Sequence, residues 1–322
     1  MTSGGGSAVD EGGSRTSRAD RLGRALRPVR VPGLVRILVV HGVGHQLGGE
    51  DTLLQVWLPG LRDGLRRTEP KLAEADLPGP GDVGCAFYGD LFRASGTKAG
   101  GGLPPYDARD VEDEFERELL DAWWREAARV DPGVPDPAAT TKLRTPRAVQ
   151  RALNALSGSR FFAGTAERVL IFSLKQVRRY FQEPEVRMAA RQRVVDAVND
   201  DTRLVIGHSL GSVVAYEALA AHPEWPVEAF VSLGSPLGIR GLIFDRLEPA
   251  PRDGIGAWPG SVRSWVNIAD QGDVVALEKQ LGTRFGDHVV DVLVDNGARA
   301  HDVRPYLTAK ETGDAVRAGL GR

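Results

Sequence analysis

Short apolar runs alternate with amphipathic stretches along most of the chain. Runs of strand length occupy residues 35–40, 83–88, 202–206, 229–233, 264–270 and 289–294. Helical spacing of apolar positions occupies residues 52–67, 111–130, 146–156, 165–181, 184–199 and 212–219. Continuously apolar strands that alternate with helices are typical of a parallel sheet buried on both faces. The pattern therefore predicts an α/β fold with a doubly wound, mostly parallel sheet.

One strand-to-helix junction carries candidate chemistry. Residues 207–211, with the sequence GHSLG, follow the apolar run 204–206 and precede the helical pattern 212–219. Glycines at Gly207 and Gly211 permit a sharp turn that lifts a serine hydroxyl above the sheet edge. A glycine-rich turn with a solvated hydroxyl is the alternative. The strand before the turn and the helix after it favour Ser209 as a covalent nucleophile.

This junction resembles the nucleophile elbow of the α/β-hydrolase superfamily, particularly its lipase and esterase branches, and the likeness covers residues 35 to about 320. The early strand also runs into the sequence HGVGH at 41–45, as the family's oxyanion loop does. The resemblance implies that the backbone N–H groups of Val43 and Leu210 form an oxyanion hole. A phosphate-binding loop is the alternative, but the required glycine spacing is missing.

The resemblance also implies the chain order serine, acid, histidine for a catalytic triad. Three histidines follow Ser209. His222 lies at a predicted helix end and His288 opens an apolar run. His301 lies in the loop after the last run, where the family keeps its catalytic histidine, so we expect His301 to be the base.

The acid is expected just beyond the apolar run 264–270. Asp273 matches the acid position of many lipases, and Asp270 at the strand end is the second candidate. An aspartate in such a turn can also simply accept backbone N–H bonds. His208 is expected to fill a structural position, and Asp302 to cap the helix that begins near residue 303.

The domain prediction is a disordered tail at 1–30 followed by one hydrolase domain at 31–322. The tail is rich in glycine and lacks apolar periodicity. Residues 91–200 contain more helices than a simple hydrolase needs, which predicts a helical insert or lid before the nucleophile strand. The connection 235–264 is expected to have little room for a cap, although residues 234–238 should line the site.

Part of this insert is basic. Residues 142–193 contain twelve Lys and Arg against three Glu, and residues 169–181 form an amphipathic stretch. Such a helix can lie on an anionic membrane or bind a protein partner. The same pattern is typical of a helix that covers its own core.

Composition narrows the function classes. The chain has 322 residues, 42% of them hydrophobic, and a formal net charge of −2. A near-neutral charge indicates no nucleic-acid partner. The single Cys85 excludes an internal disulfide. No signal sequence or membrane-spanning run is recognisable, so a cytoplasmic location is expected. His41 and His45 lack partners at metal-ligand spacing, and the predicted chemistry needs no metal or cofactor.

The predicted function is a serine hydrolase that cleaves a carboxylic ester, with a lipid or acyl ester as substrate. Ser209 would be the nucleophile, His301 the base and Asp273 the acid. One alternative is an amidase, peptidase or thioesterase with the same triad. Another is a non-catalytic module of similar fold that binds a partner or a membrane, and a third is an effector hydrolase inhibited by its insert.

Overall fold

A six-stranded sheet organises the chain. The computed structural model describes residue 1 and residues 35–93, 103–137, 143–159, 161–162 and 165–321, and one compact unit spans Leu34–Arg322. The tail predicted to be disordered, residues 1–30, lies outside the described residues except for Met1. Within the described part of the chain, no helix combines the length and the apolar character that a bilayer crossing requires.

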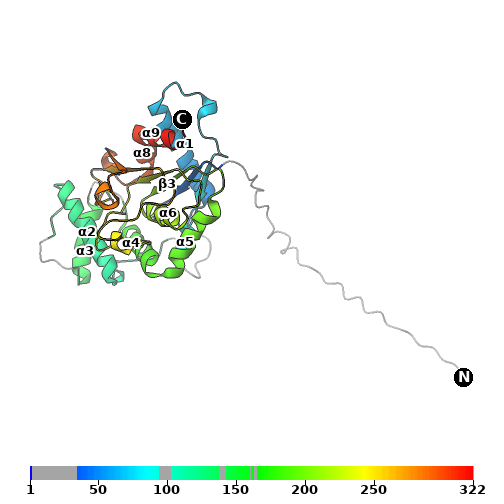
Figure 1. Ribbon diagram of the computed structural model, residues 1–322. Helices are drawn as coiled ribbons and strands as arrows, with labels where there is room; N and C mark the ends of the chain where they lie inside the picture. Colours follow the sequence, from blue (N-terminus) through cyan, green and yellow to red (C-terminus); the bar gives the residue numbers. More distant parts are fainter. Residues whose placement is uncertain (2–34, 94–102, 138–142, 160, 163–164, 322) are drawn as a thin grey trace. The chain divides into compact units, whose positions relative to one another are not determined.

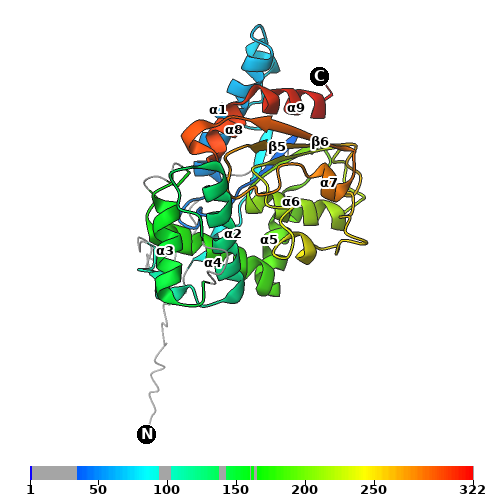
Figure 2. The ribbon, with the colours of Figure 1, turned by 90° about the vertical axis from the view of Figure 1, so that its left-hand side faces the viewer.

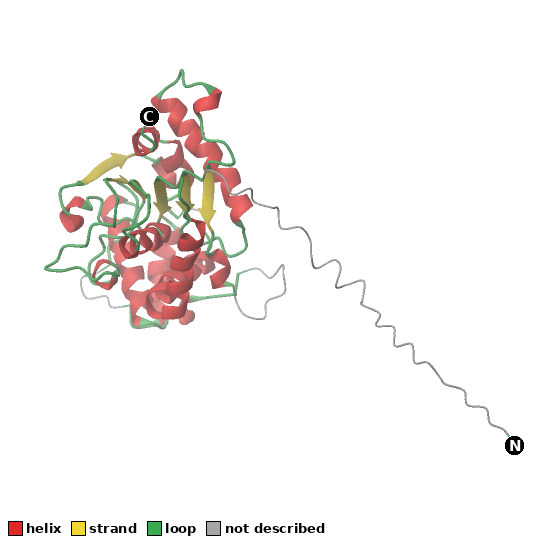
Figure 3. Cartoon of the chain, turned by 45° about the vertical axis from the view of Figure 1, so that its right-hand side comes forward, coloured by secondary structure: helices red, strands yellow, loops and turns green. Residues whose placement is uncertain are grey.

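All strand pairs of the sheet are parallel, and the strand order is β2-β1-β3-β4-β5-β6. The strands, which are yellow in Figure 3, are β1 Ile37–Val40, β2 Val83–Ala86, β3 Leu204–His208, β4 Ala229–Leu233, β5 Ser264–Asp270 and β6 Val289–Val294. Every residue of β1 to β4 is buried, as expected for strands covered on both faces. The prediction of a parallel α/β sheet is therefore confirmed.

Helices cover both faces of this sheet (Figures 1 and 2). They are α1 Glu50–Thr68, α2 Glu114–Val130, α3 Pro146–Ser157, α4 Glu167–Gln182, α5 Pro184–Ala197, α6 Leu210–Ala221, α7 Gly282–Phe285, α8 Val303–Thr308 and α9 Lys310–Gly319. Side chains of β1 alternate between two cores, because successive residues of a strand point to opposite faces. Leu38 and Val40 pack in the core that contains α2 to α6, whereas Ile37 and Val39 pack with α1, α8 and α9.

Helices α2 to α5 all lie between β2 and β3 in the sequence and pack against one another. The apolar side chains of α4, including Leu170, Ile171 and Leu174, are buried in the core. Two of its cations, Lys175 and Arg178, form ion pairs with the buried Glu116 of α2. In α4, apolar side chains thus pack in the core of this protein, and two of the basic ones bond a neighbouring helix.

A buried ion pair joins α5 to α6, the helix that follows Ser209. Glu217 is fully buried and accepts hydrogen bonds from Arg187 Nε at 2.9 Å and from the Tyr180 hydroxyl at 2.6 Å. The Arg187 guanidinium also donates to the second carboxylate oxygen of Glu217. Removing one partner of a buried pair leaves an uncompensated charge, which costs more than the pair contributes.

We therefore expect Arg187→Met to lower the free energy of unfolding by about 3 kcal/mol, because Glu217 would remain buried with only the more distant Arg191, at 4.0 Å, as a cation. Urea unfolding of the full chain measures this change. The control is Arg125→Met, which removes the exposed pair of Arg125 with Asp121 on α2. That substitution should cost at most about 0.5 kcal/mol. Equal losses in the two variants would contradict the role of Glu217.

Candidate active site

Ser209 occupies a strained turn between β3 and α6. Its backbone has φ 52° and ψ −131°, a conformation that residues with a side chain rarely adopt. The neighbouring Gly211 lies against the backbone carbonyls of Val40 and His41, where any side chain would collide with β1. The glycine therefore allows the turn to press close to the sheet, and the strained backbone sets the position of the serine.

Three side chains from separate loops meet at this turn. His301 Nε2 lies 2.9 Å from Ser209 Oγ, and His301 Nδ1 lies 2.8 Å from Asp273 Oδ2. Asp273 follows β5 and His301 follows β6, so both residues come from the carboxyl ends of parallel strands. The carboxylate can only accept from Nδ1–H, which leaves the Nε2 lone pair for the serine hydroxyl. The structure thus brings together Ser209, Asp273 and His301.

Asp273 is fully buried and is held by several donors. Its Oδ1 accepts from the backbone N–H of Val275 at 2.9 Å and of Ala276 at 3.3 Å. Its Oδ2 accepts from the Tyr306 hydroxyl at 2.8 Å in addition to His301. Burial by itself raises the pKa of Asp273, but the charge and hydrogen bond of His301 and the Val275 N–H lower that pKa below its ordinary value. The carboxylate therefore stays ionised beside the imidazole.

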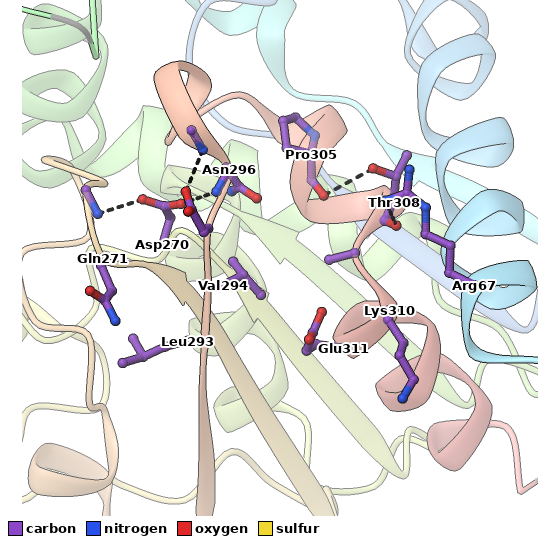
Figure 4. Close-up of a pocket in the computed structure, with 14 residues that line it drawn as sticks. Arg67, Asp270, Gln271, Leu293, Val294, Asn296, Pro305, Thr308, Lys310 and Glu311 are labelled. Carbon is purple, nitrogen blue, oxygen red and sulfur yellow. Dashed lines mark hydrogen bonds between the residues drawn. The ribbon is translucent and has the colours of Figure 1, made fainter.

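Asp270, the second candidate for the acid, faces a different part of the molecule. Its carboxylate accepts from the backbone N–H of Gly272 at 2.6 Å and from that of Asn296. It lines an open groove of about 800 Å³ together with residues of β6, α8 and α9 (Figure 4). Burial raises the pKa of Asp270, which these two backbone donors only partly offset. The geometry favours Asp273, and Asp270 has the turn-stabilising contacts expected of its alternative role.

Gly234 packs directly behind this group. Its φ is +52°, and a Cβ there would lie 2.7 Å from Asp273 Oδ2 and 3.3 Å from His301 Nδ1. Glycine is therefore required both by the backbone conformation and by the close approach. Nearby, Ser235 Oγ lies 2.7 Å from Ser212 Oγ, and the Ser212 hydroxyl donates to the Ser209 carbonyl at 2.6 Å. These contacts tie residues 234–235 to the turn that carries Ser209.

Two residues, His208 and Tyr306, support the site. A structural position was expected for His208 without its partner, and Tyr306 was not singled out from the sequence. His208 Nε2 lies 3.0 Å from the His301 carbonyl, and since a carbonyl only accepts, His208 donates. Burial and the nearby His301 lower the pKa of His208 well below its ordinary value, so this second imidazole stays neutral. Tyr306 OH accepts from the Asp270 N–H at 2.8 Å while it donates to Asp273. These contacts join residues far apart in the chain, and no local pattern signals them.

Val43 and Leu210, the predicted oxyanion donors, line the same cavity as Ser209 and His301. Leu210 is the first residue of α6, so its N–H has no acceptor within the helix. The loop that carries Val43 is fixed from outside the sheet, because the Gly44 N–H donates to the side-chain oxygen of Gln176 on α4 at 2.8 Å. Gln176 is buried and was not predicted from the sequence.

Both ring nitrogens of His41 are engaged in hydrogen bonds. His41 Nδ1 lies 2.6 Å from the Gly42 carbonyl, and the Tyr88 N–H donates to Nε2 at 3.1 Å. Burial lowers the pKa of His41 to about 3, so the ring is a neutral support for the loop. Among the described residues, no group of three or more His, Cys, Asp or Glu is arranged to hold a metal ion.

The remaining two histidines downstream of Ser209 lie elsewhere. His222 is the residue after α6, where it stacks on Trp225 and pairs with Glu224. His288 contacts the edge of the Trp258 ring. Asp302 caps α8 by accepting from the Arg304 N–H at 2.9 Å, as predicted.

A small cavity lies beside Ser209 and His301. Its volume is about 60 Å³, well below the roughly 300–1,000 Å³ of typical ligand pockets. Its walls come from the junction of β3 with α6, from α2 and α4, and from the connecting segments after β1, α3, β4, β5 and β6. The lining residues are Val43, Leu119, Trp123, Phe162, Ser173, Val177, Ser209, Leu210, Pro236, Ile243, Val275 and His301. Pro236 belongs to the segment 234–238 that was expected to line the site. Ile243 also lines the cavity, so the wall extends beyond the segment 234–238 that was predicted to form it.

The two aspartates should give opposite pH dependences of stability. For Asp273 the pKa is lowered on folding, so its stabilising contribution is complete above the ordinary value of 3.8 and is lost as the pH falls below it. For Asp270 the pKa is raised on folding, so its contribution is present below 3.8 and is lost as the pH rises through the folded value.

Urea unfolding of wild type, Asp273→Asn and Asp270→Asn between neutral pH and pH 3 measures this difference. We expect the stability advantage of wild type over Asp273→Asn to shrink on acidification below 3.8. Relative to Asp270→Asn, wild type should instead gain stability as the pH falls. Each variant is the control for the other. If the stability difference from wild type changed with pH in the same direction for both variants, the opposite pKa shifts of Asp273 and Asp270 would be wrong.

Comparisons of the chain with protein-family models, with curated proteins and with solved structures find no match. A function must therefore be inferred from the site itself. Its defining features are a strained serine, an imidazole within hydrogen-bond distance of that serine, and a buried carboxylate on the far side of the imidazole.

Proposed function

We propose that this protein is a serine-dependent ester hydrolase with a fold of the α/β-hydrolase type. The observation that carries the proposal is the continuous series of hydrogen bonds from Ser209 Oγ through His301 to Asp273. A serine hydroxyl is a weak nucleophile at neutral pH, and a base held in the correct tautomer by a carboxylate is what activates it. A structural serine needs neither the strained backbone nor the imidazole.

The acylation step follows from this arrangement. Ser209 Oγ attacks the ester carbonyl carbon while His301 Nε2 takes the hydroxyl proton, and Asp273 stabilises the imidazolium that forms. The carbonyl oxygen becomes an oxyanion, for which the N–H groups of Val43 and Leu210 are the proposed donors. When the tetrahedral intermediate collapses, the bond to the alcohol oxygen breaks and His301 gives its proton to that oxygen.

The acyl-enzyme is then hydrolysed by the same groups. His301 Nε2 takes a proton from water, and the water oxygen attacks the acyl carbon. The second tetrahedral intermediate breaks its bond to Ser209 Oγ, which recovers a proton from His301. The products are the free acid and the restored serine, and every proton that leaves a nucleophile returns to a leaving group.

The cavity supports a substrate with a short acyl group. Its volume of about 60 Å³ leaves no space for a long chain while α2 and α4 lie where they do. In this proposal the helices between β2 and β3 are the insert, and they form the pocket wall through Leu119 and Val177. An amide or a thioester would be cleaved by the same Ser209, His301 and Asp273. The substrates tested below therefore include one of each beside the esters.

The direct test is reaction with a fluorophosphonate probe, which labels activated serines. Wild type should be labelled at Ser209 and should hydrolyse p-nitrophenyl esters of short acids faster than a long-chain ester, a thioester or a peptide amide. Ser209→Ala should lose both properties. Asp273→Asn should lower kcat roughly 10⁴-fold, since the imidazole would lose its orienting carboxylate.

The matched control is Ser261→Ala, which removes a hydroxyl bonded to the Trp225 and Val227 carbonyls outside the site. That variant should label and turn over like wild type. Absence of labelling in folded wild type would overturn the proposed activity and leave a non-catalytic module. A higher activity toward the amide or thioester would redirect the proposal to those substrates.

Gln176 provides a second test, because it holds the loop that carries Val43. Gln176→Met removes the acceptor for the Gly44 N–H, and we expect kcat to fall about ten-fold as the oxyanion donor loses its fixed position. The control is Gln182→Met at the exposed end of α4, where the side chain donates to Asp113 at 3.2 Å, away from the loop that carries Val43. Unchanged kcat in Gln176→Met would show that the loop holds its position alone.

A further inference from the structure

One polar group in the cavity wall has no partner. The indole N–H of Trp123 on α2 is buried and meets no hydrogen-bond acceptor among the described residues. Trp123 itself is 3% exposed and lines the cavity that contains Ser209 and His301. Resting on the proposed function, we propose that Trp123 is a specificity residue that donates a hydrogen bond to a neutral oxygen within the acyl group of the substrate.

Three other tryptophans of this protein have an acceptor for the same group. Trp124 donates to the Pro135 carbonyl at 2.8 Å, Trp258 to the Val262 carbonyl at 2.6 Å, and Trp265 to the Ser232 hydroxyl at 2.9 Å. A buried donor without an acceptor costs about 1–3 kcal/mol, and nearly all such groups in proteins are satisfied. A substrate oxygen in the cavity would satisfy this donor, and the proposal therefore includes that the Trp123 N–H turns toward the cavity that its side chain lines.

The acyl group is the part of the substrate that must occupy this cavity. It stays covalently attached to Ser209 until water attacks, whereas the alcohol has to leave after the first step. A cavity of about 60 Å³ that contains Ser209 and His301 has space for one short group and not for two.

The oxygen that Trp123 recognises is expected to be uncharged. Most of the cavity wall is apolar, and its residues include no Lys or Arg to neutralise a carboxylate. Burying an unpaired charge there would be far more costly than burying an ether, hydroxyl or keto oxygen. The substrate class is therefore an ester of a short oxygen-substituted acid, with the oxygen beyond the carbonyl carbon.

Two esters with the same number of heavy atoms test this assignment. In p-nitrophenyl methoxyacetate an ether oxygen replaces one methylene of p-nitrophenyl butyrate, so the acyl groups have nearly equal size. The measured quantity is the ratio of kcat/KM for methoxyacetate to that for butyrate. Trp123→Phe keeps an aromatic ring but removes the N–H, and we expect the ratio to fall about five-fold. Comparing the ratio between proteins cancels the intrinsic reactivity of each ester.

The control is Val177→Ala, which enlarges the same cavity without changing a donor. Its ratio should stay close to that of wild type. If Trp123→Phe also keeps the wild-type ratio while Ser209→Ala abolishes turnover of both esters, the assignment of Trp123 is wrong and the hydrolase remains. If folded wild type neither turns over the esters nor labels with fluorophosphonate, the hydrolase proposal fails first.

A second measurement does not require the Trp123→Phe protein to fold. In Ser209→Ala, the indole N–H resonance of Trp123 is followed by NMR while ethyl methoxyacetate or ethyl butyrate is added. A downfield shift with methoxyacetate only supports the hydrogen bond. Equal shifts with both esters, or none with either, would overturn the assignment.

Discussion

The burial of one charge, the carboxylate of Asp273, is the constraint on which the site depends. A carboxylate without solvent is tolerated only where donors surround it, and here the donors come from its own turn, from Tyr306 and from His301. Those bonds hold the turn after β5, the loop that carries His301 and helix α8 together at one end of the sheet. The orientation of the imidazole toward Ser209 follows from satisfying the buried charge.

Two other histidines, His208 and His41, stay neutral and support the backbone around the site. His208 donates to the carbonyl of His301. His41 bonds its own loop through Nδ1 and accepts from the Tyr88 N–H through Nε2. Burial keeps the pKa of both rings far below the ordinary value. Their role is to position backbone, so His301 is the imidazole in contact with the serine hydroxyl.

Local patterns predicted much of the fold because buried parallel strands and their helices leave clear signals. The runs at 229–233, 264–270 and 289–294 match β4, β5 and β6, whereas α2 begins at Glu114 because Asp113 caps it. Ser209, Asp273 and His301 were identified from motif and chain order. Three other residues of the site could not be predicted in this way. Tyr306 bonds Asp273 across 33 positions of the chain, and Gln176 bonds Gly44 across 132. Trp123 stands out only because its N–H has no partner among the described residues, which no sequence pattern shows.

The hydrogen bond between Gln176 and Gly44 joins helix α4 to the loop beside Ser209. The sheet and the helices outside the segment between β2 and β3 therefore do not fix this loop by themselves. A shortened chain that kept Ser209, Asp273 and His301 but not α4 would lose the hydrogen bond that anchors the loop of Val43. Under the proposed function, α4 supplies both this anchor and part of the wall around the acyl group, so substitutions in α4 would change rate and substrate choice together.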